Sequence, residues 1–385
     1  MQVLLNFLLI LFFVATNLVQ VNTSSENGSV VLPTFVPLIC KVIFWVFLTF
    51  SVGLYLTAKN KRLLFMHWLI VLFYFIPFMY AIASQTEILR YALLLLCFFS
   101  IPFSVSFIIQ RTSVKKILNT LNIIIILVFG LGLLLNISTF LNGQRFQGIF
   151  YNPNMYGFLC VFWLTILLID DKTTKKKTFF FRTLLLVIIL FTLFLSGSRT
   201  SFAAVLIVLL FTFYNRIKNI VLPVLLLSAI FYLVLDYFNL GEIVERYSTS
   251  GNLAQSSGRA TYWNKVYNYL RLEPWWGYGM DAPDKLVNSN IHNNYLRYLF
   301  TMGRFFTLFT LIPLVLFYGY ICKKFLNKIP NSLIGFVLAY AVLNFGEDYF
   351  IGVTSTSSMS FAFVLGIMIY YIKSYNTNEN LSNIE

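Results

Sequence analysis

Long uncharged apolar runs are the feature that most limits what this chain can fold into. Residues 123–135 and 205–213, for example, contain no charged side chain. Charged residues make up 11% of the 385-residue chain, compared with about 25% in a typical soluble domain. Such runs span a bilayer as helices, because open β-structure would leave backbone groups unpaired in lipid. A transmembrane β-barrel does not fit, since its strands alternate polar and apolar residues. The sequence therefore predicts an all-α integral membrane protein.

The positively charged residues are placed regularly between these apolar runs. The formal net charge is +14, but most Lys and Arg residues lie in short clusters after every second apolar span. Basic loops of this kind face the cytoplasm. The pattern predicts that both termini are cytoplasmic, and it gives no reason to expect a nucleic-acid partner. The clusters are Lys59, Lys61 and Arg62; Arg111, Lys115 and Lys116; Lys172, Lys175, Lys176, Lys177 and Arg182; Arg216 and Lys218; Lys323, Lys324 and Lys328; and Lys373.

Hydropathy predicts about twelve transmembrane helices in one membrane domain over residues 1–373. The first span has no Lys or Arg before it and no clear Ala-x-Ala site, so we expect a retained helix rather than a signal peptide. Residues 374–385 are rich in Asn, and we expect them to form a disordered cytoplasmic tail. The expected spans are 3–20, 35–57, 63–83, 88–110, 118–139, 154–170, 179–196, 201–215, 219–239, 294–321, 331–346 and 350–372.

Residues 240–293 form one long extracytoplasmic loop. A loop of this length with many Tyr and Trp residues is expected to be functional rather than disordered. Within it, residues 259–272 have the periodicity of a helix, and one face combines an arginine with an apolar stripe. This pattern predicts a helix that lies on the membrane surface. The residues of that face are Arg259, Trp263, Val266 and Leu270.

Two arginines lie in predicted outer turns, where the positive-inside rule disfavours them. Arg199 follows a Ser-Gly-Ser turn at the expected start of a helix. Arg145 precedes Asn152 and Pro153, which are typical of the first residues of a helix. The start of a helix attracts anions. Each arginine can therefore bind an anion at the depth of a lipid-linked phosphate, or it can simply contact lipid headgroups.

Acid–base groups occur where the long loop returns to the membrane and between the last two spans. His292 can accept a proton near neutral pH, although a lone histidine is also a common structural residue. Arg259 needs an anionic partner, and lipid would serve. Glu347 and Asp348 can bind sugar hydroxyls, act as an auxiliary base, or form an ordinary polar turn. We find no metal-binding motif on the outside and expect no cofactor.

Several short motifs occur in a fixed order between residues 140 and 305. Their order and spacing resemble the signature region of the O-antigen polymerase and O-antigen ligase superfamily. The motifs are Arg145-x-x-Gly148, Ser-x-Ser-Arg199, Ser-Gly-Arg259, Trp263, Gly277-x-Gly279, His292-Asn293-x-Tyr295-Leu296 and Gly303.

The resemblance implies a GT-C-like glycosyltransferase in the cytoplasmic (inner) membrane of a bacterium, with its site facing outward. Such enzymes use an undecaprenyl-diphosphate-linked oligosaccharide without metal, and a flippase and a chain-length regulator would work beside it. By motif, Arg199 and Arg259 would bind the diphosphate, and His292 would take the proton of the acceptor hydroxyl. The residues expected to help bind the substrates are Arg145, Asn293, Trp263, Glu347 and Asp348.

Three functions remain open from the sequence. We favour a polymerase that joins repeat units, because polymerases diverge freely outside the signature, as this chain does. A ligase would instead move the finished glycan to lipid A–core or to a protein. A non-enzymatic transporter or flippase is less favoured, since few ionisable residues lie deep in the predicted spans and no internal repeat is visible.

Overall fold

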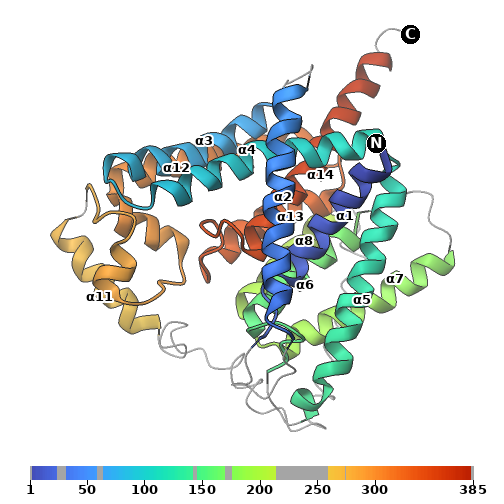
Figure 1. Cartoon of the computed structure of the whole chain (residues 1–385), viewed down its shortest axis with the longest axis horizontal. Coiled ribbons are helices and arrows are strands. Elements are labelled where there is room, and N and C mark those ends of the chain that lie inside the picture. Colours follow the sequence, from blue (N-terminus) through green and yellow to red (C-terminus); the bar gives the residue numbers. More distant parts are fainter. Residues whose placement is uncertain are drawn as a thin grey trace. The chain divides into compact units, whose positions relative to one another are not determined.

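The regular elements of the computed structural model are helices (Figure 1). The structure describes residues 2–23, 32–58, 64–141, 145–169, 176–213, 259–273 and 275–382. Within these ranges six helices are long and apolar enough to cross a membrane, and five shorter helices are also apolar. The chain is therefore an all-α, multi-pass membrane protein, as predicted. The predicted span 219–239 and the start of the long loop lie outside the described residues, and the total of about twelve spans stays a prediction.

The helices pack as two compact units, and each is described by itself. Helices α2 (Phe35–Thr57) and α13 (Asn331–Leu343) contribute residues to both units. The prediction of one membrane domain over residues 1–373 stays a prediction. The first unit also contains α1 (Gln2–Leu18), α5 (Val114–Leu141), α6 (Pro153–Leu167), α7 (Lys176–Leu195) and α8 (Arg199–Thr212). The second also contains α3 (Phe65–Ala83), all but the last three residues of α4 (Ile88–Arg111), α11 (Arg259–Leu272), the π-helical turn η4 (Pro283–Val287), α12 (Asn294–Phe325) and α14 (Thr356–Ser382).

Most predicted spans agree with a helix to within a few residues, but the last one does not. Helix α14 starts and ends later than the predicted span 350–372. The hydroxyl of Ser355 accepts a hydrogen bond from the Ser358 amide at 3.2 Å, which fixes the helix start. No Gly or Pro occurs between residues 367 and 385, so no residue there breaks the backbone hydrogen bonds. The prediction of a disordered tail is therefore wrong for residues 374–382, which are helical.

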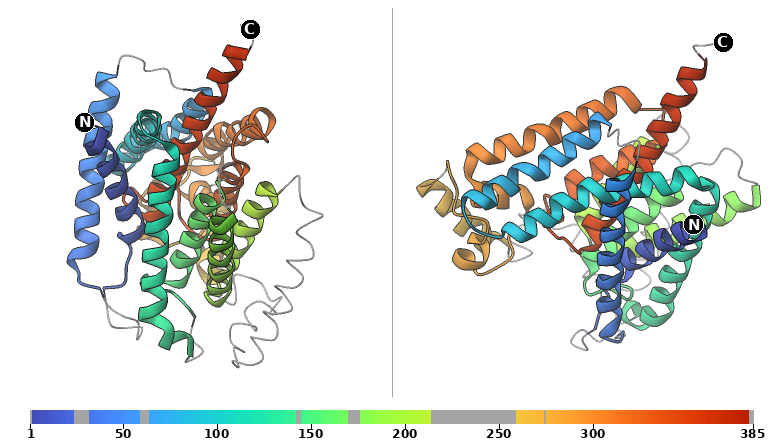
Figure 2. Two further views of the ribbon diagram at one scale, coloured as in Figure 1. Left: turned by 90° about the vertical axis from the view of Figure 1, so that its right-hand side faces the viewer. Right: turned by 45° about the horizontal axis from the view of Figure 1, so that its top comes forward.

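In the first unit, α6 is buried along almost its whole length, and α7 and α8 pack against it (Figure 2). The Asn152 side chain caps α6 by accepting a hydrogen bond from the Met155 amide at 2.9 Å. Pro153 is the first helical residue, so the predicted start of this helix is confirmed. Gly157 permits the close contact with α8, because a Cβ atom there would lie 2.8 Å from Cβ of Ser198.

In the second unit, α3 and α12 lie side by side, and α12 is interrupted near its start (Figure 1). The break is at Gly303, whose φ of +71° is in the region that favours glycine. The loop before η4 crosses α12 there: the Gly279 amide donates to the Thr301 carbonyl at 2.9 Å, and the Phe305 amide donates to the Trp275 carbonyl at 3.3 Å. A side chain at Gly303 would collide with this loop.

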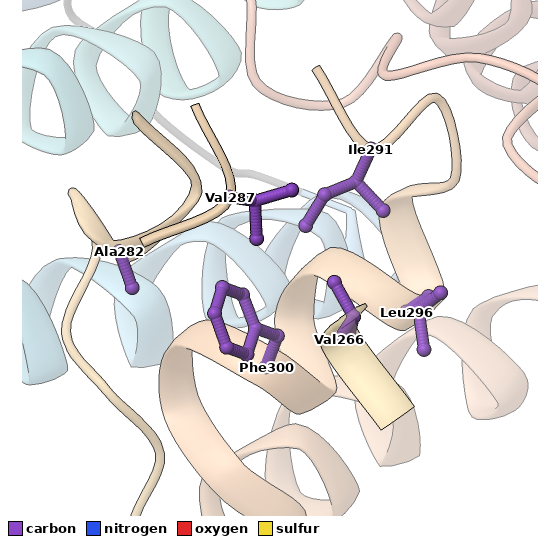
Figure 3. Packing of buried hydrophobic residues seen from close by; sticks show 6 residues of the cluster. All are labelled: Val266, Ala282, Val287, Ile291, Leu296 and Phe300. Carbon is purple, nitrogen blue, oxygen red and sulfur yellow. The ribbon is translucent and has the colours of Figure 1, made fainter. Parts of the chain in front are cut away.

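Helix α11 packs its apolar stripe on a small core of the second unit (Figure 3). Val266 is fully buried, with Trp263 and Leu270 packed beside the cluster. Protein therefore covers Val266 at the centre of the stripe, and the predicted position of the helix at the membrane surface stays a prediction. The returning loop and the start of α12 supply the apolar partners, whose burial stabilises the contact. The cluster consists of Val266, Ala282, Val287, Ile291, Leu296 and Phe300.

Candidate active site

A carboxylate in the loop between α13 and α14 contacts two functional groups of the second unit. Glu347 Oε1 lies 2.8 Å from Arg259 Nη2, and its Oε2 lies 2.9 Å from His292 Nδ1. Arg259 also donates from Nη1 to the Gly346 carbonyl at 2.7 Å. Three of the predicted site residues therefore meet at one place, although they come from distant parts of the sequence.

The contact with Glu347 indicates which nitrogen of His292 carries a proton. An ionised carboxylate only accepts hydrogen bonds, so we assign the proton to Nδ1, and Nε2 of the neutral ring keeps its electron pair. The side chain is 37% exposed, which leaves the ring open to a substrate. Its backbone φ of +50° is uncommon for a residue other than glycine. His292 is thus an oriented, accessible base in a backbone conformation that the sequence did not indicate.

Hydrogen bonds fix the residues on both sides of His292. The indole Nε1 of Trp263 donates to the Ile291 carbonyl at 2.8 Å. Asn293 caps α12, since its side-chain oxygen accepts from the Leu296 amide at 3.0 Å. The polar groups of Trp263 and Asn293 therefore position His292, and their expected contact with substrate stays a prediction.

A buried pair of asparagines attaches the loop after α13 to the start of α12. The Asn294 amide donates to the Asn344 carbonyl at 3.0 Å, and the two side-chain amides also contact each other. Both residues are fully buried, where unpaired amide groups would be costly. The sequence analysis missed both, because a single Asn beside a helix end looks like an ordinary cap.

A second ion pair lies one helical turn beyond Asn293. Arg297 Nη1 is 3.3 Å from Asp348 Oδ2, and the two side chains are only 8% and 7% exposed. Within the described part of the chain, Arg297 Nε and Asp348 Oδ1 have no hydrogen-bond partner. The sequence analysis missed Arg297, although opposite charges at the ends of two apolar spans could have suggested the pair.

The two neighbouring carboxylates have different electrostatic surroundings. Burial alone would raise the pKa of Glu347, but the hydrogen bond with His292 and the charge of Arg259 lower that pKa below its ordinary value. At Asp348 burial outweighs the attraction of Arg297, and the pKa of that carboxyl is raised. Glu347 is therefore the ionised partner that an arginine and a histidine base require.

The other two predicted arginines belong to the first unit. Arg145 Nε donates to the Ser196 carbonyl at 2.8 Å, and its Nη2 donates to Asn154 Oδ1 at 3.1 Å. Arg199 is the first residue of α8, directly after the turn that contains Ser196. Arg145 thus attaches the segment before α6 to the turn that presents Arg199. The anion-binding roles of both arginines stay predictions.

The second unit therefore combines three chemical capacities at one place. Arg259 can bind an anion, His292 can take a proton through Nε2, and Glu347 orients both. This combination suits the displacement of an anionic leaving group by a hydroxyl group. Among the residues that the structure describes, no three His, Cys, Asp or Glu side chains gather as metal ligands would.

A comparison with known families identifies this region. Residues 184–312 match the family model described as O-antigen ligase. The matched segment contains Arg199, all of α11, His292 and Gly303. No curated protein matches the chain. The match confirms the resemblance that the short motifs predicted.

Proposed function

We propose that this chain, which matches the O-antigen ligase family model over residues 184–312, is a polysaccharide polymerase. It would join undecaprenyl-diphosphate-linked oligosaccharide repeat units at the outer face of the bacterial cytoplasmic membrane. The reaction would be a metal-independent glycosyl transfer of the GT-C type. The observation that carries the proposal is the cluster of Arg259, Glu347 and His292, of which Arg259 and His292 lie in the matched segment.

The cluster supplies the groups that such a transfer needs. The acceptor hydroxyl oxygen attacks the anomeric carbon of the donor sugar, and Nε2 of His292 takes the hydroxyl proton. The bond from that carbon to the diphosphate breaks, and its electron pair leaves with the diphosphate oxygen. Arg259 stabilises the negative charge that develops there. Because the hydroxyl attacks directly, we expect inversion at the anomeric carbon.

The exposure of the groups fits these roles. The Arg259 and His292 side chains are 20% and 37% exposed, whereas the Glu347 side chain is 13% exposed. A substrate can therefore meet the arginine and the imidazole directly, whereas the carboxylate is less accessible to it. A general base contributes roughly 10²- to 10⁴-fold to rate, and one charge-stabilising donor contributes roughly 10²- to 10³-fold.

A ligase is the second candidate, because the description of the matched family is O-antigen ligase. A ligase would use the same donor and the same three residues, and only the acceptor would differ. The acceptor would be lipid A–core or a protein rather than another lipid-linked repeat unit. A flippase and a chain-length regulator are proposed as working partners in the polymerase case.

The surface polysaccharide of cells carrying single variants tests the proposal. Arg259→Ala removes the anion-binding group. His292→Asn removes the base but suits the left-handed backbone, which asparagine tolerates. Arg271→Ala is the matched control, since Arg271 is an exposed arginine in the last turn of the same helix. Arg199→Ala and Arg145→Ala test the first unit separately, and membrane expression is measured for every variant.

The gel pattern separates the candidates. A polymerase variant lacking activity attaches a single repeat unit to the acceptor and produces no ladder. An inactive ligase variant instead accumulates full-length glycan on undecaprenyl diphosphate. A normal ladder from well-expressed Arg259→Ala and His292→Asn proteins would refute the assigned site.

A further inference from the structure

Glu347 shares its negative charge with Arg259 and His292. Its Oε1 accepts a hydrogen bond from Arg259, and its Oε2 contacts Nδ1 of His292. The guanidinium is always protonated, whereas the imidazole gains its second proton only in part of the pH range. Any change that draws Arg259 away therefore leaves more of the carboxylate charge to His292.

We propose that Glu347 is a positioning residue that couples the binding of a phosphate-bearing group at Arg259 to the proton affinity of His292. This inference rests on the proposed function, because it assumes that the donor diphosphate occupies Arg259. The arriving anion competes with Glu347 for the guanidinium. As the guanidinium turns toward the anion, more of the carboxylate charge is left to His292.

Arg259 is the partner of Glu347 that an anion can draw away, by replacing its hydrogen bonds to Glu347 and to the Gly346 carbonyl. It is the first residue of α11, its side chain is 20% exposed, and the start of a helix attracts anions. The backbone of Glu347 is held in place, because its amide donates to the Leu343 carbonyl at 3.1 Å. The adjacent Asp348 is tied to Arg297 in the buried ion pair. The carboxylate therefore stays beside His292 while the arginine responds to the ligand.

Among the residues that the structure describes, the charged groups near His292 are balanced before a ligand binds. Arg259 from α11 and Arg297 from α12 oppose Glu347 and Asp348 from the loop between α13 and α14. A phosphate-bearing group adds negative charge to this set and so raises the affinity of Nε2 of His292 for a proton, such as the one that it takes from the acceptor hydroxyl. The coupling is reciprocal, so the same anion must bind more tightly when His292 is protonated. In the proposed reaction, His292 thus becomes a stronger base once the donor is present.

The two histidines of the chain allow a direct test on the full-length protein. Isotope-labelled imidazoles give two NMR signals, and the His292→Asn variant assigns them. His67 is buried with Nε2 2.8 Å from the Phe98 carbonyl, so its signal reports that the second unit is folded. The probe is farnesyl diphosphate, and farnesol is its uncharged control. The quantity measured is the pH midpoint at which the His292 signal titrates, with and without the probe.

We expect farnesyl diphosphate to raise this midpoint in the wild type by at least about 0.7 pH unit more than in Glu347→Gln. That difference is about fivefold in proton affinity, the lower end for coupled sites. The direct field of the diphosphate acts in both proteins and cancels in the comparison. Asp281→Asn is the carboxylate control and should respond like the wild type, because Asp281 pairs with the exposed Lys285. Farnesol should move neither midpoint.

Arg259→Gln provides a second variant that does not depend on the stability of Glu347→Gln. It should raise the pH midpoint of His292 without any probe, because Arg259 no longer shares the carboxylate charge of Glu347. An unmoved midpoint in this variant would overturn the coupling. Equal probe responses in the wild type and Glu347→Gln would also overturn it, while leaving the proposed function intact, because the diphosphate still binds. Failure of farnesyl diphosphate to bind the wild type would overturn both.

Discussion

The hydrogen bond from Trp263 to the residue before His292 gives a quantitative prediction. In Trp263→Phe a ring still fills the space beside the cluster, but the indole N–H that donates to the Ile291 carbonyl at 2.8 Å is lost. Ile291 is fully buried, so its carbonyl loses a partner that water does not readily replace. An unsatisfied buried group costs about 1–3 kcal/mol. If that cost falls on the aligned state of His292, transfer slows by about 5- to 150-fold.

The assay is the initial rate of glycan transfer in membranes that contain equal amounts of each protein. Trp275→Phe is the matched control, because Trp275 is 59% exposed and its replacement leaves the Ile291 carbonyl paired. We expect Trp275→Phe to retain more activity than Trp263→Phe. A Trp263→Phe protein with a rate within about twofold of the wild type would refute the positioning role, since the smallest expected effect is larger.

Three further predictions concern the surroundings of the site. Arg297→Met leaves the buried Asp348 carboxylate unpaired and should destabilise the protein by about 3–5 kcal/mol, and adding Asp348→Asn should restore part of the loss. An unchanged thermal unfolding midpoint in detergent would contradict the buried pair. Gly303→Ala should yield little folded protein, because alanine is strained at a φ of +71° and its side chain meets the crossing loop. Gly319→Ala is the control: a Cβ atom there would lie in open space, so this variant should elute like the wild type in size-exclusion chromatography. In Glu347→Gln the free energy of unfolding should decrease less than in the wild type when the pH is lowered into the acid range. The lowered pKa of Glu347 means that its stabilising contribution is complete above its unfolded-state pKa and disappears as the pH falls through the folded-state value. The raised pKa of Asp348 has the opposite effect on the pH dependence of stability, but it is present in both proteins. If the stability of both proteins fell equally in acid, the assignment of Glu347 as the partner of Arg259 and His292 would be contradicted.

Local patterns in the sequence predicted the elements that carry the site. The helix expected over residues 259–272 is α11, and the span expected to begin at residue 294 begins there as α12. Helical periodicity and capping residues act over a few neighbouring positions, so one sequence is enough to reveal them. The short motifs around Arg259 and His292 also predicted the resemblance that the family model matches over residues 184–312.

The contacts that bring the functional groups of the site together could not be predicted from local patterns. Glu347 and His292 are far apart in the chain, and their contact depends on the buried pair of Asn294 and Asn344. No local pattern encodes that pairing. The apolar face of α11 was assigned to lipid because hydropathy does not distinguish burial against lipid from burial against protein. Val266 packs on protein instead.

The most direct test of the account is transfer by purified protein in lipid vesicles. The substrate is labelled undecaprenyl-diphosphate-linked oligosaccharide, and the proteins compared are the wild type, His292→Asn and the Arg271→Ala control. We predict that the wild type and the control lengthen the glycan without added metal, and that His292→Asn is slower by at least about 100-fold, the lower limit for loss of a general base. A folded His292→Asn protein that transfers glycan at the wild-type rate would contradict the account.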